Sequence, residues 1–143
     1  MAGNELKVLS AGAVKGGVAQ LAAEFGRATG TRVTVDFAPA PELRDRIAAG
    51  ETADVVILPQ GMMDGLAQQG KIIPDSRAFL GRSLMGVTVH ATAPAQDLAN
   101  TEAFKRVVLG ATAVVFNRAS SGLYAAKLLE KLGLAKTLGS RIV

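Results

Sequence analysis

The sequence has 143 residues, of which 49% are apolar and 20% are charged, and its formal net charge is +4. These values indicate a globular protein of one domain or two small lobes and exclude a disordered chain. The absence of cysteine excludes disulfides, thiol catalysis and thiolate metal sites.

The sixteen Lys and Arg residues are scattered, and only 4% of the residues are aromatic, so the sequence argues against a nucleic-acid partner. No apolar stretch is long enough to span a membrane. Met1–Glu5 shows neither the basic nor the apolar region of a signal peptide. We therefore expect either a cytoplasmic protein or a secreted one whose leader has been removed.

The first half of the chain alternates apolar, β-branched runs with amphipathic stretches that end at glycine. This pattern predicts strands at 6–9, 32–37 and 53–58, and helices that start near Val14, at Glu42 and at Gln60. Alternation of this kind is typical of a parallel sheet with helices on both faces. The sequence therefore predicts an α/β fold.

The second half continues the alternation less regularly. It predicts strands at 84–90 and 111–116, a helix at 101–109 and another that opens after 117–122 and closes at Gly133. Residues 140–143 have the pattern of a further strand that begins there.

Two loops of small residues, Ser10–Gly17 and Asn117–Gly122, each follow a strand and open a helix. Backbone N–H groups and a hydroxyl at such a junction can bind an anion. The alternative is an ordinary turn, with Ser120 or Ser121 capping the second helix. Tyr124, just beyond the second loop, faces either a ligand or the core.

Catalytic and cofactor motifs are not recognisable. The stretch Gly12–Gly17 is neither a dinucleotide nor a phosphate-loop fingerprint. His90 is the only histidine, which excludes a histidine-based metal cluster within one chain. Asp36, Glu51 and Asp54 are candidate carboxylates, with a capping role expected for Asp54. We therefore expect no enzymatic activity, no cofactor and no metal.

The segments that follow resemble, in combination, the molybdate-binding-protein-like branch of the type II periplasmic solute-binding proteins. They are Lys7–Ala13, Thr29–Gly30, Val33–Phe37, Leu43–Glu51, Ala53–Ile57, Gly70–Ile73, Arg82–Val87, Ser121–Tyr124 and Leu132–Gly133. The resemblance implies two parallel-sheet, three-layer α/β lobes, at residues 1–82 and 83–143, that close around one ligand. In the family the chain continues past the position of Val143, which implies an incomplete second lobe here.

Carried over by position, the family's ligand contacts fall at Ala13 and Ala38–Ala40 in the first lobe and near Ser121 in the second. Together with the two loops, they give this predicted ligand-binding set: Ser10, Ala11, Gly12, Ala13, Ala38, Pro39, Ala40, Ser120, Ser121 and Tyr124. Family members that bind molybdate have a serine where this chain has Ala13, and hydroxyls where it has Ala38–Pro41. The lost donors argue against tight molybdate binding.

These observations predict a solute-binding protein for a small anion, an oxyanion or an organic acid, that works by cleft closure. The resemblance implies an ABC permease as a partner, and a second copy of the chain is expected to cover the incomplete lobe. Alternatives are a cytoplasmic ligand sensor, a proton-transfer isomerase or tautomerase that uses His90 or Asp36, and a truncated remnant without a ligand.

Overall fold

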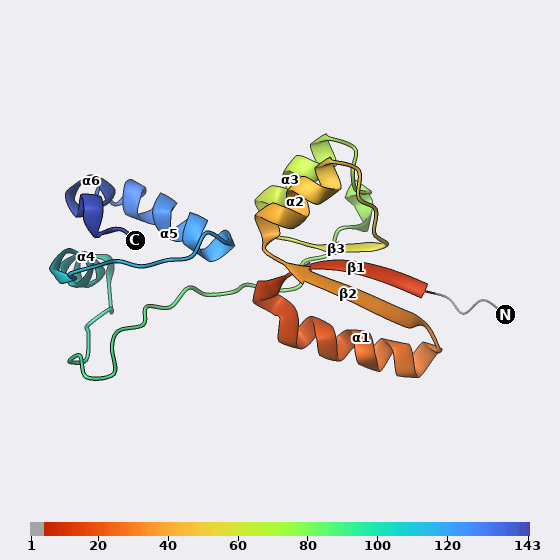
Figure 1. Cartoon of the computed structure of the whole chain (residues 1–143), viewed down its shortest axis with the longest axis horizontal. Helices are drawn as coiled ribbons and strands as arrows, with labels where there is room; N and C mark the ends of the chain where they lie inside the picture. The colour runs from red at the N-terminus through yellow and green to blue at the C-terminus, as the bar shows by residue number, and fades with distance from the viewer. Residues whose placement is uncertain (1–4) are drawn as a thin grey trace. The chain divides into compact units, whose positions relative to one another are not determined.

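The structure is a computed structural model that describes residues 5–143, and it divides into two compact units. Unit 1 extends to Ser83, and unit 2 spans Leu84–Val143. Unit 1 carries the sheet, whereas unit 2 is built mainly from helices (Figure 1). In the part of the chain that is described, no helix is both long and apolar enough to cross a membrane.

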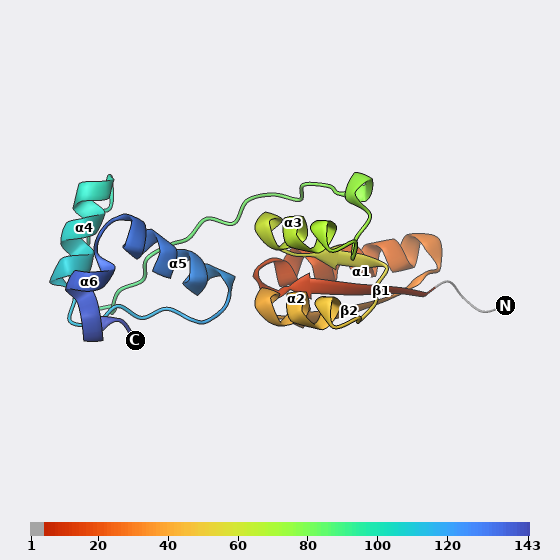
Figure 2. The same cartoon turned by 90° about the horizontal axis from the view of Figure 1, so that it is seen from above.

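Unit 1 is a three-layer α/β/α sandwich around a parallel sheet of order β2-β1-β3. Helix α1 covers one face of the sheet, and helices α2 and α3 cover the other (Figures 1 and 2). The elements are β1 (Glu5–Ala11), α1 (Lys15–Thr29), β2 (Arg32–Ala38), α2 (Ala40–Ala48), β3 (Val55–Ile57) and α3 (Gln60–Gln68), with 3-10 helices at Gly12–Val14 and Pro74–Ser76. This architecture confirms the α/β fold and the parallel sheet predicted from the sequence.

The core of unit 1 lies between the central strand and the two helices above it. Leu9 of β1 is fully buried against Leu43 and Ile47 of α2 and Leu66 of α3. Full burial of one such side chain stabilises the fold by roughly 1.5–3 kcal/mol. Because side chains alternate along a strand, a residue next to Leu9 points to the opposite face, toward α1.

Unit 2 contains α4 (Thr101–Gly110), α5 (Ser120–Lys131) and α6 (Ala135–Leu138), followed by a 3-10 helix at Gly139–Arg141. Helix α4 begins where predicted because the side chain of Asn100 accepts a hydrogen bond from the backbone N–H of Ala103 at 2.9 Å. The buried residues that hold the unit together come from α4, α5 and the C-terminal segment: Val108, Leu129, Leu134 and Leu138.

The predicted strand at 84–90 is wrong, because these residues have no regular secondary structure and Leu84 is 90% exposed. A strand needs a hydrogen-bonded neighbour, and no described segment pairs with this one. The prediction for 111–116 holds only as one parallel bridge between Val114 and Ile142. There the N–H of Val114 donates to Arg141 at 2.8 Å, and the N–H of Val143 donates back to Val114 at 3.0 Å.

Candidate functional site

The carboxyl edge of the unit 1 sheet is the edge where all three strands end and lead into helices. Strand β1 runs into the 3-10 helix at Gly12–Val14 and then α1, β2 runs into α2, and β3 runs into α3. The register pairs Ala11 with Ala38, so the turns after β1 and β2 lie side by side. The edge therefore brings together the seven predicted residues of the first lobe: Ser10, Ala11, Gly12, Ala13, Ala38, Pro39 and Ala40.

The helix starts at this edge lack side-chain caps. The N-cap positions are Ala11 before the 3-10 helix, Val14 before α1, Pro39 before α2 and Pro59 before α3, and none accepts a backbone N–H through its side chain. The first turns of α1 and α3 contain no acidic residue, whereas the first turn of α2 contains Glu42. Free N–H groups and the positive ends of helix dipoles favour a negative ligand at such a place.

The predicted residues differ in what they offer at this edge. Gly12 and Ala13 are exposed, so their backbone groups are accessible. Ser10 is fully buried, and its hydroxyl donates to the carbonyl of Ala11 at 3.3 Å. Ala40 is buried, and Pro39 has no N–H. The donors accessible here are therefore backbone N–H groups and not hydroxyls.

Lys15 is a charged residue at this edge that the sequence reasoning missed. It is the first residue of α1, where a cation opposes the helix dipole. Its ammonium lies 5.6 Å from the centroid of the Phe37 ring, near the end of β2. The ring stabilises the cation in this place. The signal in the sequence is a lysine inside an otherwise small and neutral loop.

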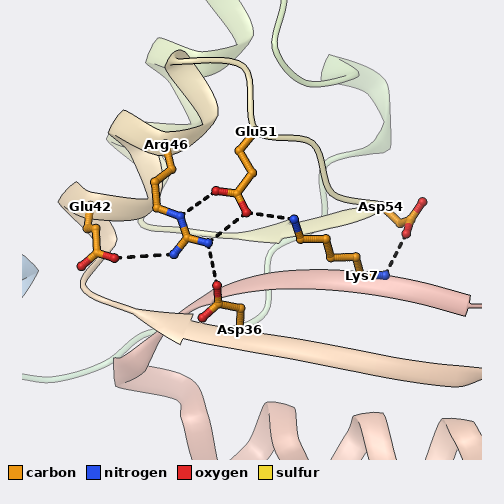
Figure 3. Close-up of polar contacts among 6 residues, drawn as sticks. All are labelled: Lys7, Asp36, Glu42, Arg46, Glu51 and Asp54. Atoms are coloured by element: carbon orange, nitrogen blue, oxygen red, sulfur yellow. Dashed lines mark hydrogen bonds and ion pairs between the residues drawn. The ribbon is translucent and has the colours of Figure 1, made fainter.

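Arg46 of α2 contacts three carboxylates between that helix and the sheet (Figure 3). Its guanidinium donates to Asp36 Oδ2 at 2.6 Å, to Glu51 Oε2 at 2.6 Å and to Glu51 Oε1 at 2.9 Å. It also lies 3.5 Å from Glu42 Oε1, while Lys7 Nζ donates to Glu51 at 2.8 Å. We call these five residues the Arg46 cluster.

Two of the candidate carboxylates from the sequence, Asp36 and Glu51, belong to the Arg46 cluster. Hydrogen bonds from Arg46, and next from Lys7, lower the pKa of Glu51 from 4.5 to about 2. Hydrogen bonds to Glu51, and next to Asp36, raise the pKa of Arg46. The third candidate, Asp54, accepts the backbone N–H of Lys7 at 2.8 Å, which is a capping role at a strand. These three carboxylates have structural partners.

In unit 2, Asn117 organises the loop before α5. Its Oδ1 accepts the backbone N–H of Ala119 at 2.9 Å and that of Gly122 at 3.3 Å, and its side chain also contacts the hydroxyl of Ser121. The N-cap residue, Ala119, makes no side-chain bond. The alternative of capping by Ser120 or Ser121 is therefore not what the structure shows, because Asn117 accepts the N–H groups of Ala119 and Gly122.

Two further predicted residues of unit 2 have clear surroundings. Tyr124 is 58% exposed, so it is not part of the core of this unit. His90 Nδ1 lies 2.8 Å from the hydroxyl of Thr92 on an exposed segment. Among residues 5–143, no cluster of histidine or acidic side chains has the arrangement of a metal site.

In open parallel α/β sheets, ligands bind outside the carboxyl ends of the strands, and unit 1 has this class of architecture. Residues 6–143 match the family described as bacterial extracellular solute-binding protein, and the chain belongs to this family.

Two proteins that resemble this chain carry different names. The substrate binding domain of a molybdenum ABC transporter from Clostridium difficile superimposes with a TM-score of 0.56 at 18% identity, covering 97% of this chain and 61% of its own. This likeness shows the fold of a periplasmic binding protein. An aconitate isomerase from a Pseudomonas species is 35% identical over 131 residues, which are 87% of this chain and 49% of the relative. The chain thus spans about half the length of this curated relative.

The isomerase relative corrects one expectation from the sequence. We expected no enzymatic activity because the motifs of common enzymes are missing. A protein that is 35% identical carries the name of an enzyme, which contradicts that expectation. The physical reason is that proton transfer needs only one or two well-placed groups, and these leave no recognisable spacing in a sequence.

Proposed function

We propose that this protein binds a small organic carboxylate at the carboxyl edge of unit 1. The observation that carries the proposal is the meeting of three helix starts at this edge, none of them capped by a side chain. Lys15, held near the edge by Phe37, adds a positive charge. Membership of a solute-binding family supports a binding role, and an ABC permease is the partner that such a role implies.

An organic acid suits this edge better than a metal oxyanion. Ala13 and Ala38–Ala40 carry no hydroxyl, and the buried hydroxyl of Ser10 is already engaged. Each missing hydrogen bond costs roughly 0.5–1.5 kcal/mol of net binding, or more for a charged acceptor. The aconitate isomerase relative supports a tricarboxylate of the aconitate type.

Thermal unfolding and calorimetry with cis-aconitate, trans-aconitate, citrate, sulfate and molybdate test the proposal. A ligand at one hundred times its Kd stabilises the protein by about 2.7 kcal/mol, which is a clear rise in Tm. We expect the carboxylates to raise Tm and molybdate to leave it unchanged. A rise with molybdate alone refutes the preference for carboxylates, and no rise with any anion refutes the binding site.

A pair of variants locates the ligand. Ala13→Asp places a carboxylate at the edge, where it caps the free N–H groups and repels an anion. We expect it to weaken binding at least about tenfold, since a charge-assisted hydrogen bond is lost. Ala23→Asp makes the same change of charge on an exposed position of α1 and serves as the matched control. Equal effects of the two variants contradict the proposed location.

Isomerisation of the bound carboxylate is the second candidate function, and the name of the relative favours it. Asp36 and His90, the predicted proton carriers, both have polar partners in the structure. Glu42, in the first turn of α2, is a further candidate carboxylate, and it too pairs with Arg46, at 3.5 Å. Incubation with cis-aconitate, followed by proton NMR for the trans isomer, tests this activity. Binding without conversion refutes the isomerase and leaves the binding proposal in place.

The remaining predictions from the sequence concern unit 2 and assembly. Contact of Ser120, Ser121 or Tyr124 with a ligand stays a prediction, and binding by a Ser121→Leu variant measures it. Association through a second copy also stays a prediction, and size-exclusion chromatography with light scattering measures it.

A further inference from the structure

We infer that Arg46 is a positioning residue for the anion site, since it fixes the turn between β2 and α2 that forms part of the carboxyl edge. This inference rests on the proposed function. Arg46 itself lies in the last turn of α2. It therefore acts on the site through the segments that it joins and not by contact with the ligand.

The contacts of Arg46 span the turn from both sides. Asp36 lies two residues before the end of β2, and Glu42 lies in the first turn of α2. Arg46 Nη2 lies 2.6 Å from Asp36, and Nη1 lies 3.5 Å from Glu42 (Figure 3). A planar guanidinium holds two carboxylates in a fixed relation, which a single ammonium does not do. The strand end and the helix start are thereby held together.

Packing and one backbone hydrogen bond also hold the turn. Pro39 lacks an N–H and makes no side-chain cap, and its carbonyl accepts the N–H of Leu43 at 3.1 Å. Leu43 and Ala40 are buried, which packs the first turn of α2 on the sheet. Loss of Arg46 leaves this packing in place and removes the polar link across the turn.

Charge gives Arg46 a second effect on the same site. The Arg46 cluster holds two cations against three carboxylates. Without Arg46, Asp36 and Glu42 remain near the edge with no cation in contact, and they repel an anionic ligand. Both effects act in the same direction, so an experiment has to separate them.

Calorimetry with cis-aconitate and amide hydrogen exchange on the full chain separate the two effects. Arg46→Met removes both the planar guanidinium and its charge, whereas Arg46→Lys keeps the charge and removes the guanidinium. Arg44→Met is the matched control, since Arg44 lies on the same helix and, within residues 5–143, pairs only with its exposed neighbour Asp45. The exchange rate of the Leu43 amide reports on the turn without any ligand.

We expect Arg46→Met to raise the Kd about tenfold or more and to speed exchange of the Leu43 amide. We expect Arg46→Lys to give an intermediate Kd with exchange still fast. Arg44→Met should change the Kd less than about twofold, as is usual for an exposed pair. If Arg46→Met does not fold, Asp36→Asn breaks the link on the strand side and should also speed exchange at Leu43.

Three outcomes overturn the inference. They are a Kd for Arg46→Met close to that of Arg44→Met, unchanged exchange at Leu43, and full recovery by Arg46→Lys, which would mean that charge alone matters. A wild-type protein that binds none of the tested anions refutes the proposed function instead. In that case exchange at Leu43 still decides whether Arg46 holds the turn.

Discussion

Gly122 is the residue at which the smallest possible change should damage unit 2 the most. A Cβ added there would lie 1.4 Å from the carbonyl oxygen of Asn117 and 2.5 Å from its carbonyl carbon. Ordinary contacts of a Cβ begin at 3.4 Å, so the loop must open by about 2 Å. That movement separates the side chain of Asn117 from the N–H groups of Ala119 and Gly122.

We expect Gly122→Ala to lower the free energy of unfolding of unit 2 by about 2–4 kcal/mol, from overpacking and two weakened hydrogen bonds. Tyr124 is the only tyrosine, and the chain has no tryptophan, so tyrosine fluorescence during urea unfolding reports on unit 2 alone. Gly110→Ala is the matched control, because a Cβ at Gly110 meets nothing within 4 Å. A loss below about 1 kcal/mol, the value of one hydrogen bond, refutes the reasoning.

Two further predictions concern unit 1. Glu51→Gln should lower the free energy of unfolding at neutral pH. The pKa of Glu51 falls from 4.5 to about 2 on folding. The difference in unfolding free energy between wild type and variant should therefore be full above pH 4.5 and vanish toward pH 2. Because the tyrosine reports on unit 2, urea unfolding followed by far-UV circular dichroism at several pH values measures this, and a deficit independent of pH contradicts it. Gly65→Ala, inside α3 with open space around it, should raise stability by about 0.5–1 kcal/mol in the same assay, and a decrease contradicts it.

Local pattern was sufficient to predict unit 1 from the sequence and insufficient for unit 2. The parallel sheet follows from alternating apolar segments that pair with one another within unit 1. The segment 84–90 has equally good strand propensity, but propensity says nothing about whether a neighbour is available for pairing. The strand prediction for this segment is wrong because it used local sequence alone, whereas pairing depends on segments that are distant in sequence.

The candidate site also has a part that the sequence could predict and a part that it could not. The position of Ala11 beside Ala38 was predictable, because parallel strands end at one edge. The Arg46 cluster was not, because Lys7 and Glu51 lie 44 residues apart in sequence, and Asp36 reaches Arg46 across a turn. Asn117 was overlooked because the serines at the start of α5 offered a simpler cap.

Binding a carboxylate and isomerising it require many of the same groups at such an edge. Free N–H groups and a lysine that hold a carboxylate also stabilise the additional negative charge that develops when a proton leaves the carbon beside it. A solute-binding edge thus already supplies the electrostatic part of an isomerase, and one proton acceptor within reach of the ligand completes it. Under the proposed function, a binding protein and an isomerase at this edge would differ in whether a proton acceptor lies within reach of the ligand, so the shared fold does not decide the activity.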